Sequence, residues 1–150
     1  MKKLAILIGA AAALAAPAFA IEDAIATRKA IMQGNGALAG LAVGIMKGEI
    51  PYSPAAANAV LIGLRADAMS FGDYIPAESD AGDNTRASPK IWEDRAGFDA
   101  ELAKFQETTA AAAEAGGREG PADLAAFQAA VGPVLQTCQS CHEGYQLSRD

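Results

Sequence analysis

Apolar residues recur along this chain at the three- and four-residue spacing of a helix, and almost no stretch alternates as a half-buried strand would. Alanine is abundant, which also favours helix. The pattern predicts four helices. We expect the first from about Glu22 to Lys47, because apolar residues there follow two adjacent tracks with a seven-residue repeat: Ile25, Met32, Ala39 and Met46, with Ile31, Leu38 and Ile45 beside them.

The first predicted helix is interrupted by Gly34-Asn35-Gly36, which would ordinarily indicate a turn. The alternative is that a glycine allows something large and flat to approach the backbone closely. Gly36, Gly40 and Gly44 also form a ridge of small residues, four positions apart. The pattern leaves both interpretations open, and the cofactor inferred below favours a continuous helix.

The second and third predicted helices share a start signal, a serine followed by proline. Ser53 is placed to cap the second helix, with Pro54 at its first position, and this helix should end near Phe71-Gly72. A long polar connection covers residues 73–87. The third helix should then begin at Ser88-Pro89.

The end of the third helix and the whole of the fourth follow from glycine and proline positions. Gly116-Gly117 should end the third helix, and Gly120-Pro121 should open the fourth. Pro133 lies inside the fourth helix and should kink or split it one turn before the cysteines. Four helices with one longer connection predict an all-α, antiparallel four-helix bundle.

The first twenty residues have the composition of a secretory signal peptide. Met-Lys-Lys precedes an apolar run from Leu4 to Ala16, and Pro17-Ala18-Phe19-Ala20 supplies a cleavage site of small residues. The apolar run is too short to span a bilayer as a helix. We therefore predict a cleaved signal peptide, residues 1–20, and a single mature domain, residues 21–150, located in the periplasm without membrane insertion.

The mature chain is strongly acidic. Cleavage after Ala20 removes Lys2 and Lys3 and no acidic residue, which takes the formal net charge from −6 to −8. Such a charge opposes binding to nucleic acid or to an anionic lipid surface. A partner protein with a basic docking patch fits better.

Both cysteines and the single histidine fall within five residues, Cys138-Gln139-Ser140-Cys141-His142. This is the signature of covalent haem attachment. On a helix, Cys138 and Cys141 share one face, so both thiols can add to the two vinyl groups on one edge of a porphyrin. His142 lies on the same face, where its imidazole can bind the iron.

Three other interpretations of this motif are weaker. A simple disulfide is possible in an exported protein. A thioredoxin-like motif would lie beside a βαβ unit, and a zinc site would need four ligands, which the cysteines and the histidine do not supply. An alanine-rich core with few Leu and Phe residues also leaves volume that a haem would fill. The sequence therefore predicts one covalent haem c.

A haem motif at the C-terminal end of a four-helix chain resembles the class II c-type cytochromes, the cytochrome c′ family. The resemblance extends over residues 21–150. Its landmarks, in order along the chain, are Arg28 and Met32, Lys47–Tyr52, Pro89–Trp92 and Cys138–Tyr145. It implies haem bound near one end of the bundle, and the possibility of a homodimer.

The resemblance also bears on the second axial ligand, because Met32 matches the position of the family's distal residue. Met32-Gln33-Gly34-Asn35-Gly36 is similar to the family's low-spin branch, in which methionine sulfur closes the iron site. The resemblance then implies a non-enzymatic, one-electron carrier with His142 and Met32 as axial ligands and a redox protein as its partner. Met32 could instead be core packing in a five-coordinate, high-spin protein that binds nitric oxide or other small gases.

Two basic positions complete the comparison with the family. Arg28 lies one turn before Met32, where it could pair with a haem propionate. Many members carry Arg or Lys directly after the tyrosine that follows the haem histidine, whereas this chain has Gln146. Arg149 is a candidate to replace that positive group.

Overall fold

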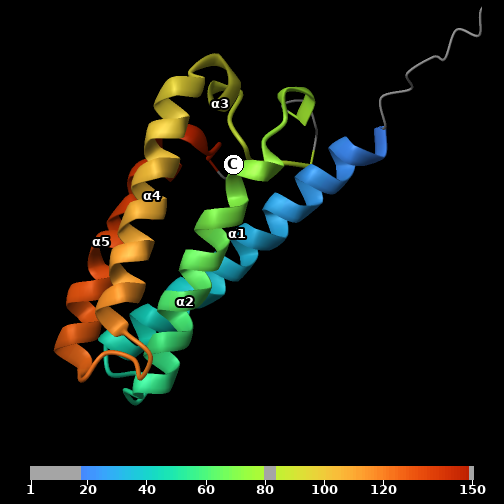
Figure 1. Cartoon of the computed structure of the whole chain (residues 1–150). Helices are drawn as coiled ribbons and strands as arrows, with labels where there is room; N and C mark the ends of the chain where they lie inside the picture. The colour runs from blue at the N-terminus through green and yellow to red at the C-terminus, as the bar shows by residue number, and fades with distance from the viewer. Residues whose placement is uncertain (1–17, 80–83, 149–150) are drawn as a thin grey trace, which may run out of the picture.

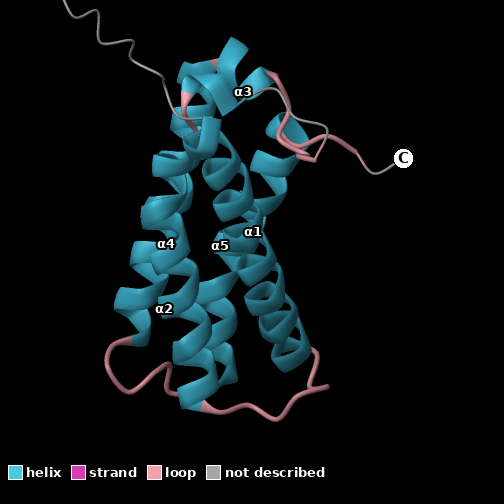
Figure 2. Ribbon diagram, turned by 90° about the vertical axis from the view of Figure 1, so that its right-hand side faces the viewer, coloured by secondary structure: helices cyan, strands magenta, loops and turns pink. Residues whose placement is uncertain are grey.

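Four long helices lie side by side, and successive ones run in opposite directions (Figure 1). The computed structural model describes residues 18–79 and 84–148. The long helices are α1 (Ala18–Met46), α2 (Pro54–Phe71), α4 (Arg95–Gly116) and α5 (Leu124–Tyr145). Figure 2 shows helices and loops throughout the described part, which contains one isolated β-bridge and confirms the all-α bundle. The predicted signal peptide lies largely outside the described residues, as does Arg149.

The connection between α2 and α4 carries three short helical pieces. Two 3-10 turns, Gly72–Tyr74 and Ala77–Ser79, follow α2 directly, and the short helix α3 (Lys90–Glu93) precedes α4. The prediction of a single third helix beginning at Ser88-Pro89 is therefore wrong, because the segment forms two helices, α3 and α4. The helix breaks at Asp94, whose carboxylate accepts a hydrogen bond from the amide of Gly97 and caps α4.

The remaining helix ends follow the sequence signals with two differences. Ser53 caps α2 through the amide of Ala56, and the first residue of α2 is Pro54, both as predicted. The fourth helix begins later than Gly120-Pro121, because Asp123 is the residue whose side chain caps α5. Pro133 does not split α5, which continues to Tyr145.

Helix α1 is continuous through Gly34, Asn35 and Gly36, which confirms the helical interpretation of that segment. At Gly36 an added Cβ would meet no atom within 4 Å, so the backbone here borders open space. At Gly63 of α2 an added Cβ would lie only 2.7 Å from the Leu38 side chain. A larger residue at Gly63 would therefore have to displace the end of the Leu38 side chain.

The apolar core consists of two clusters. The larger one joins α1, α2, α4 and α5 toward the end where the short loops lie, and Val60, Phe127, Val131 and Val134 in it are 0% exposed. The smaller cluster surrounds α3 and contains Phe71, Ile75, Ile91, Phe98 and Tyr145. Helix α1 packs mainly on α2 and makes few contacts with α5. Beside the smaller cluster, the space between α1 and α5 is a cavity.

None of the helices within the described ranges is long and apolar enough to cross a membrane.

Candidate functional site

A cavity of about 730 Å³ lies at the α3 end of the bundle, with a smaller pocket of about 120 Å³ adjoining it. The two share several lining residues, so they form one site: Met32, Gly36, Phe71, Phe98, Cys141 and His142. Their size is that of a pocket for a small-molecule cofactor. Helix α1 forms one wall, α5 the opposite wall, and the α2–α3 connection closes the rim.

The wall formed by α5 presents the motif residues predicted from the sequence. Cys138 and Cys141 are half-buried free thiols one helical turn apart, and both line the smaller pocket. Burial raises the pKa of Cys138, and burial together with the charges of Glu101 and Cys138 raises the pKa of Cys141 to about 11. At neutral pH both side chains are therefore protonated thiols.

His142 lies on the same wall and lines both parts of the cavity. Burial, and secondarily the positive charge of Arg86, lower the pKa of its imidazole. The neutral imidazole is the form that binds a metal ion. Within the described residues there is no cluster of three or more His, Cys, Asp or Glu side chains able to hold a bare metal ion, so a protein-only zinc site does not fit.

The wall formed by α1 presents Met32 together with Asn35. The Asn35 side chain, 7% exposed, donates from Nδ2 to the Met32 sulfur at 3.9 Å, and its Oδ1 has no partner among the described residues. Met46 packs against the larger core cluster, and Met69 is 65% exposed. Of these three methionines, Met32 is the one that lines the cavity. The contact between Met32 and Asn35 was not predicted from the sequence, in which Asn35 belonged to an apparent turn and to the segment resembling the low-spin branch.

Arg28 enters the same cavity but also holds the loop that closes it. Its guanidinium donates to the carbonyl of Tyr74 at 3.1 Å, and to Oγ and the carbonyl of Ser79 at 2.7 Å each. It also lies 5.5 Å from the centre of the Trp92 ring. The side chain is 3% exposed, burial lowers its pKa, and its Nε has no partner in the described part of the chain.

The charge of the cavity is opposite to that of the chain. Arg28, Lys29 and Arg86 line it, and no acidic side chain is among the lining residues that the structure describes. Its floor is apolar, formed by Phe71, Ile91 and Phe98 among others. A flat apolar ligand that carries carboxylates fits such a site, and two thiols at one edge suit its covalent attachment. Lys29 and Arg86 were not anticipated from the sequence.

Comparison with known proteins agrees with this geometry. The family model described as Cytochrome C′ matches residues 23–146. The chain belongs to the cytochrome c′ family. It resembles the cytochrome c′ of Rhodopseudomonas palustris, with 35% identity over 88% of this chain and 87% of that protein. The cytochrome c-556 of the same bacterium is 31% identical over 97% of each protein.

A solved structure of cytochrome c′ from Rhodopseudomonas palustris has a TM-score of 0.76 with this chain, at 34% identity, covering 85% of this chain and 98% of that one. Cytochrome c′ proteins are four-helix bundles with one covalent haem c, and this chain is accordingly a haem c cytochrome. Members of the family are periplasmic electron carriers or gas-binding haemoproteins, and generally not enzymes.

Proposed function

We propose that this cytochrome is a periplasmic one-electron carrier with a low-spin haem, in which His142 and Met32 are the axial ligands. The observation that supports it is that these two side chains lie on opposite walls, α5 and α1, of one cavity and line both of its parts. A haem between the walls would meet a nitrogen ligand on one face and a sulfur ligand on the other.

Cys138 and Cys141 would hold the ring through thioether bonds, because both thiols lie on the face of α5 that lines the smaller pocket. Their raised pKa values do not oppose this attachment, since a thioether carries no charge. Gly36 borders open space on the facing wall, so a ring edge would meet no side chain there. The short spacing of the motif would then bring His142 within reach of the iron.

A hydrogen bond from a neighbouring side chain would orient the sulfur of Met32 for ligation. Asn35 Nδ2 donates to Met32 Sδ, which would leave a second lone pair of the sulfur for the iron. Haem iron supplies the one-electron couple, and a thioether ligand favours its ferrous form. Arg28, whose Nε has no partner among the residues that the structure describes, would pair with a haem propionate at the loop side of the cavity.

The acidic surface supports docking to a redox partner with a basic patch. The mature chain predicted from residue 21 has a formal charge of −8, and the haem carboxylates would add to this negative charge. Long-range attraction to a basic protein would then accelerate encounter.

The absorption spectrum of the ferric holoprotein at neutral pH tests this function. Ligation by Met32 predicts a low-spin spectrum with the weak far-red band of sulfur-to-iron charge transfer. A high-spin ferric spectrum would contradict the proposal. It would assign the protein to the gas-binding group of the family, with His142 as the sole protein ligand.

A further inference from the structure

The end of the chain pairs with the α2–α3 connection beside His142. The amide of Ser88 donates to the carbonyl of Tyr145 at 3.0 Å, and the amide of Leu147 donates to the carbonyl of Arg86 at 2.9 Å. Between them, Ala87 and Gln146 form an antiparallel bridge. Two segments about sixty residues apart in the sequence are thereby fixed to each other at the rim of the cavity.

The side chain of Arg86 strengthens this pairing. Its Nε and Nη2 both donate to the carbonyl of Leu147, at 3.1 and 2.7 Å, and Nη2 also donates to Oε1 of Gln146 at 3.2 Å. These bonds hold the guanidinium just beyond the C-terminal end of α5. A positive charge is favourable there because the end of a helix carries partial negative charge.

This position places the charge on the His142 side of the cavity. Gln146 follows His142 by one helical turn, and its amide donates to the His142 carbonyl at 3.2 Å. Arg86, Gln146 and His142 all line the larger part of the cavity. Over residues 18–79 and 84–148, the single ion pair joins Arg95 to Asp99, so no carboxylate there neutralises Arg86 directly.

We propose that Arg86 supplies, from the α2–α3 connection, the positive charge that this chain lacks at position 146, and that it raises the reduction potential of the haem. In many members of the family that this chain resembles, an Arg or Lys directly after the tyrosine on the haem helix carries that charge, whereas this chain has Gln146 there. Here Gln146 instead accepts a hydrogen bond from the arginine. The inference rests on haem c and on His142 as its ligand, and it is independent of Met32.

A cation near the iron destabilises the ferric form, which has one more positive charge than the ferrous form. Arg86→Gln should therefore shift the one-electron equilibrium toward the ferric form by roughly two- to tenfold, because the guanidinium is partly solvated. For one electron this corresponds to a potential lower by about 18 to 59 mV. The measurement belongs at low ionic strength, where screening is weakest.

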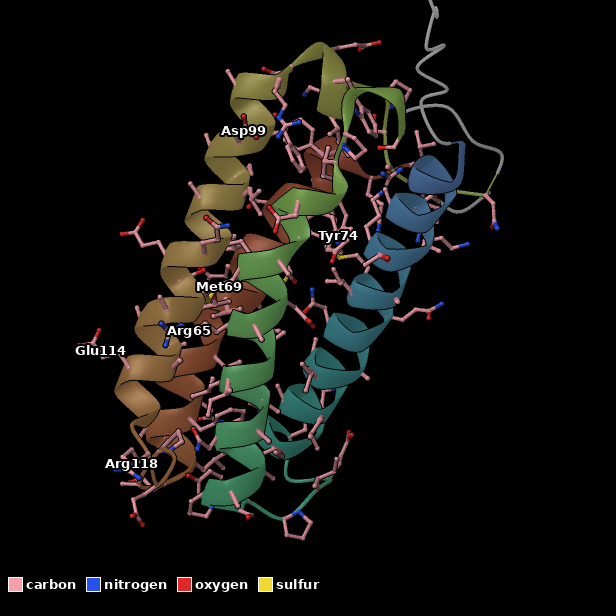
Figure 3. All side chains as sticks on the ribbon, turned by 45° about the vertical axis from the view of Figure 1, so that its right-hand side comes forward. Arg65, Met69, Tyr74, Asp99, Glu114 and Arg118 are labelled. Carbon is pink, nitrogen blue, oxygen red and sulfur yellow. The ribbon has the colours of Figure 1, made fainter. Side chains whose placement is uncertain are left out.

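The matched control is Arg118→Gln, which removes the same charge. Figure 3 places Arg118 at the far end of the bundle from Tyr74, whose carbonyl accepts a hydrogen bond from the cavity residue Arg28. The fall in reduction potential caused by Arg118→Gln should be less than half of that caused by Arg86→Gln. Arg86→Lys, which keeps the charge but loses the fork of hydrogen bonds, should retain most of the potential.

A relocated charge gives the sharpest test. Adding Gln146→Arg to Arg86→Gln returns one cation to the same end of α5, so at least half of the lost potential should be recovered. Equal shifts for Arg86→Gln and Arg118→Gln would overturn the proposal, since net charge would then explain both. Failure of the double variant to recover potential, while it folds and binds haem normally, would also overturn it and assign Arg86 to a haem propionate.

Discussion

Replacing Met32 by leucine removes the sulfur while preserving most of the packing. Met32 is half-buried against the smaller core cluster, so this nearly volume-conserving change should cost less than about 1.5 kcal/mol through packing. Met32→Ala also lacks the sulfur and in addition loses side-chain volume. Its packing cost should be about 2 kcal/mol, at the low end for buried methionine because the side chain is partly exposed.

Spectroscopy and denaturation then separate ligation from packing. Ligation predicts that both variants become high-spin in the ferric state, lose the far-red sulfur band, fall in reduction potential and gain affinity for carbon monoxide. Their difference in unfolding free energy reports packing alone, since neither retains the sulfur. Met46→Leu and Met69→Leu are the matched controls, because these methionines do not line the cavity, and their spectra should equal that of the wild type.

The decisive outcome is the spin state of Met32→Leu. If the wild type is low-spin and this variant remains low-spin, another group ligates the iron and the assignment of Met32 is wrong. A stability loss without a spectral change would identify Met32 as core packing. A change in the Met69→Leu spectrum would instead implicate a residue that is largely exposed here.

Three further outcomes are expected. The mature protein should begin at Ile21 and have the mass of residues 21–150 plus one haem that acid-acetone does not extract; a mass equal to that of the bare chain would exclude attachment at Cys138 and Cys141. Burial, and next the hydrogen bond to Asp94 at 2.9 Å, raise the pKa of Tyr145 above 10.0. The neutral phenol therefore stabilises the folded state at pH values below the ordinary pKa of tyrosine, and this stabilisation is lost as the pH rises through the folded-state pKa. Urea titrations from about pH 9 to about pH 11 should accordingly show a smaller loss of stability in Tyr145→Phe than in wild type. Electron transfer to a basic partner should slow as salt rises, because screening acts over about 10 Å near 0.1 M, and a rate that rises or stays flat would argue against electrostatic docking.

The features that were predictable from the sequence are those specified by neighbouring residues. Ser53 and Pro54 define the start of α2 locally, and the structure places that start where they predict it. The motif on α5 needs only the geometry of one helical turn to bring Cys138, Cys141 and His142 to one wall. By contrast, the continuity of α1 at Gly36 could be chosen only by assuming a cofactor, because glycine and asparagine locally favour a turn.

The break at Asp94 was not predicted because two local rules compete there. Pro89 and the apolar spacing favour a helix from that point onward, whereas Asp94 can cap a new helix by accepting from the amide of Gly97. The choice depends on distant contacts. Tyr145 donates to the same carboxylate and Trp92 donates to the carbonyl of Pro76, so both pieces are held by partners that the local sequence does not reveal.

The α2–α3 connection is the part of the site where local sequence is least informative. Its composition is that of a polar loop, but its carbonyls are bound by side chains from other elements. Arg28 of α1 holds Tyr74 and Ser79, and Arg95 of α4 holds the carbonyl of Ile75 at 3.2 Å.

Because buried backbone carbonyls need hydrogen-bond partners, these donors take the place of a helix or sheet and give the connection a fixed path. Arg86 then continues this path to the end of α5. The wall formed by the connection is thus specified by arginines spread over almost seventy residues. For this reason the haem-attachment motif predicts the cofactor from the sequence alone, whereas Arg86, proposed to raise its reduction potential, is found only from the fold.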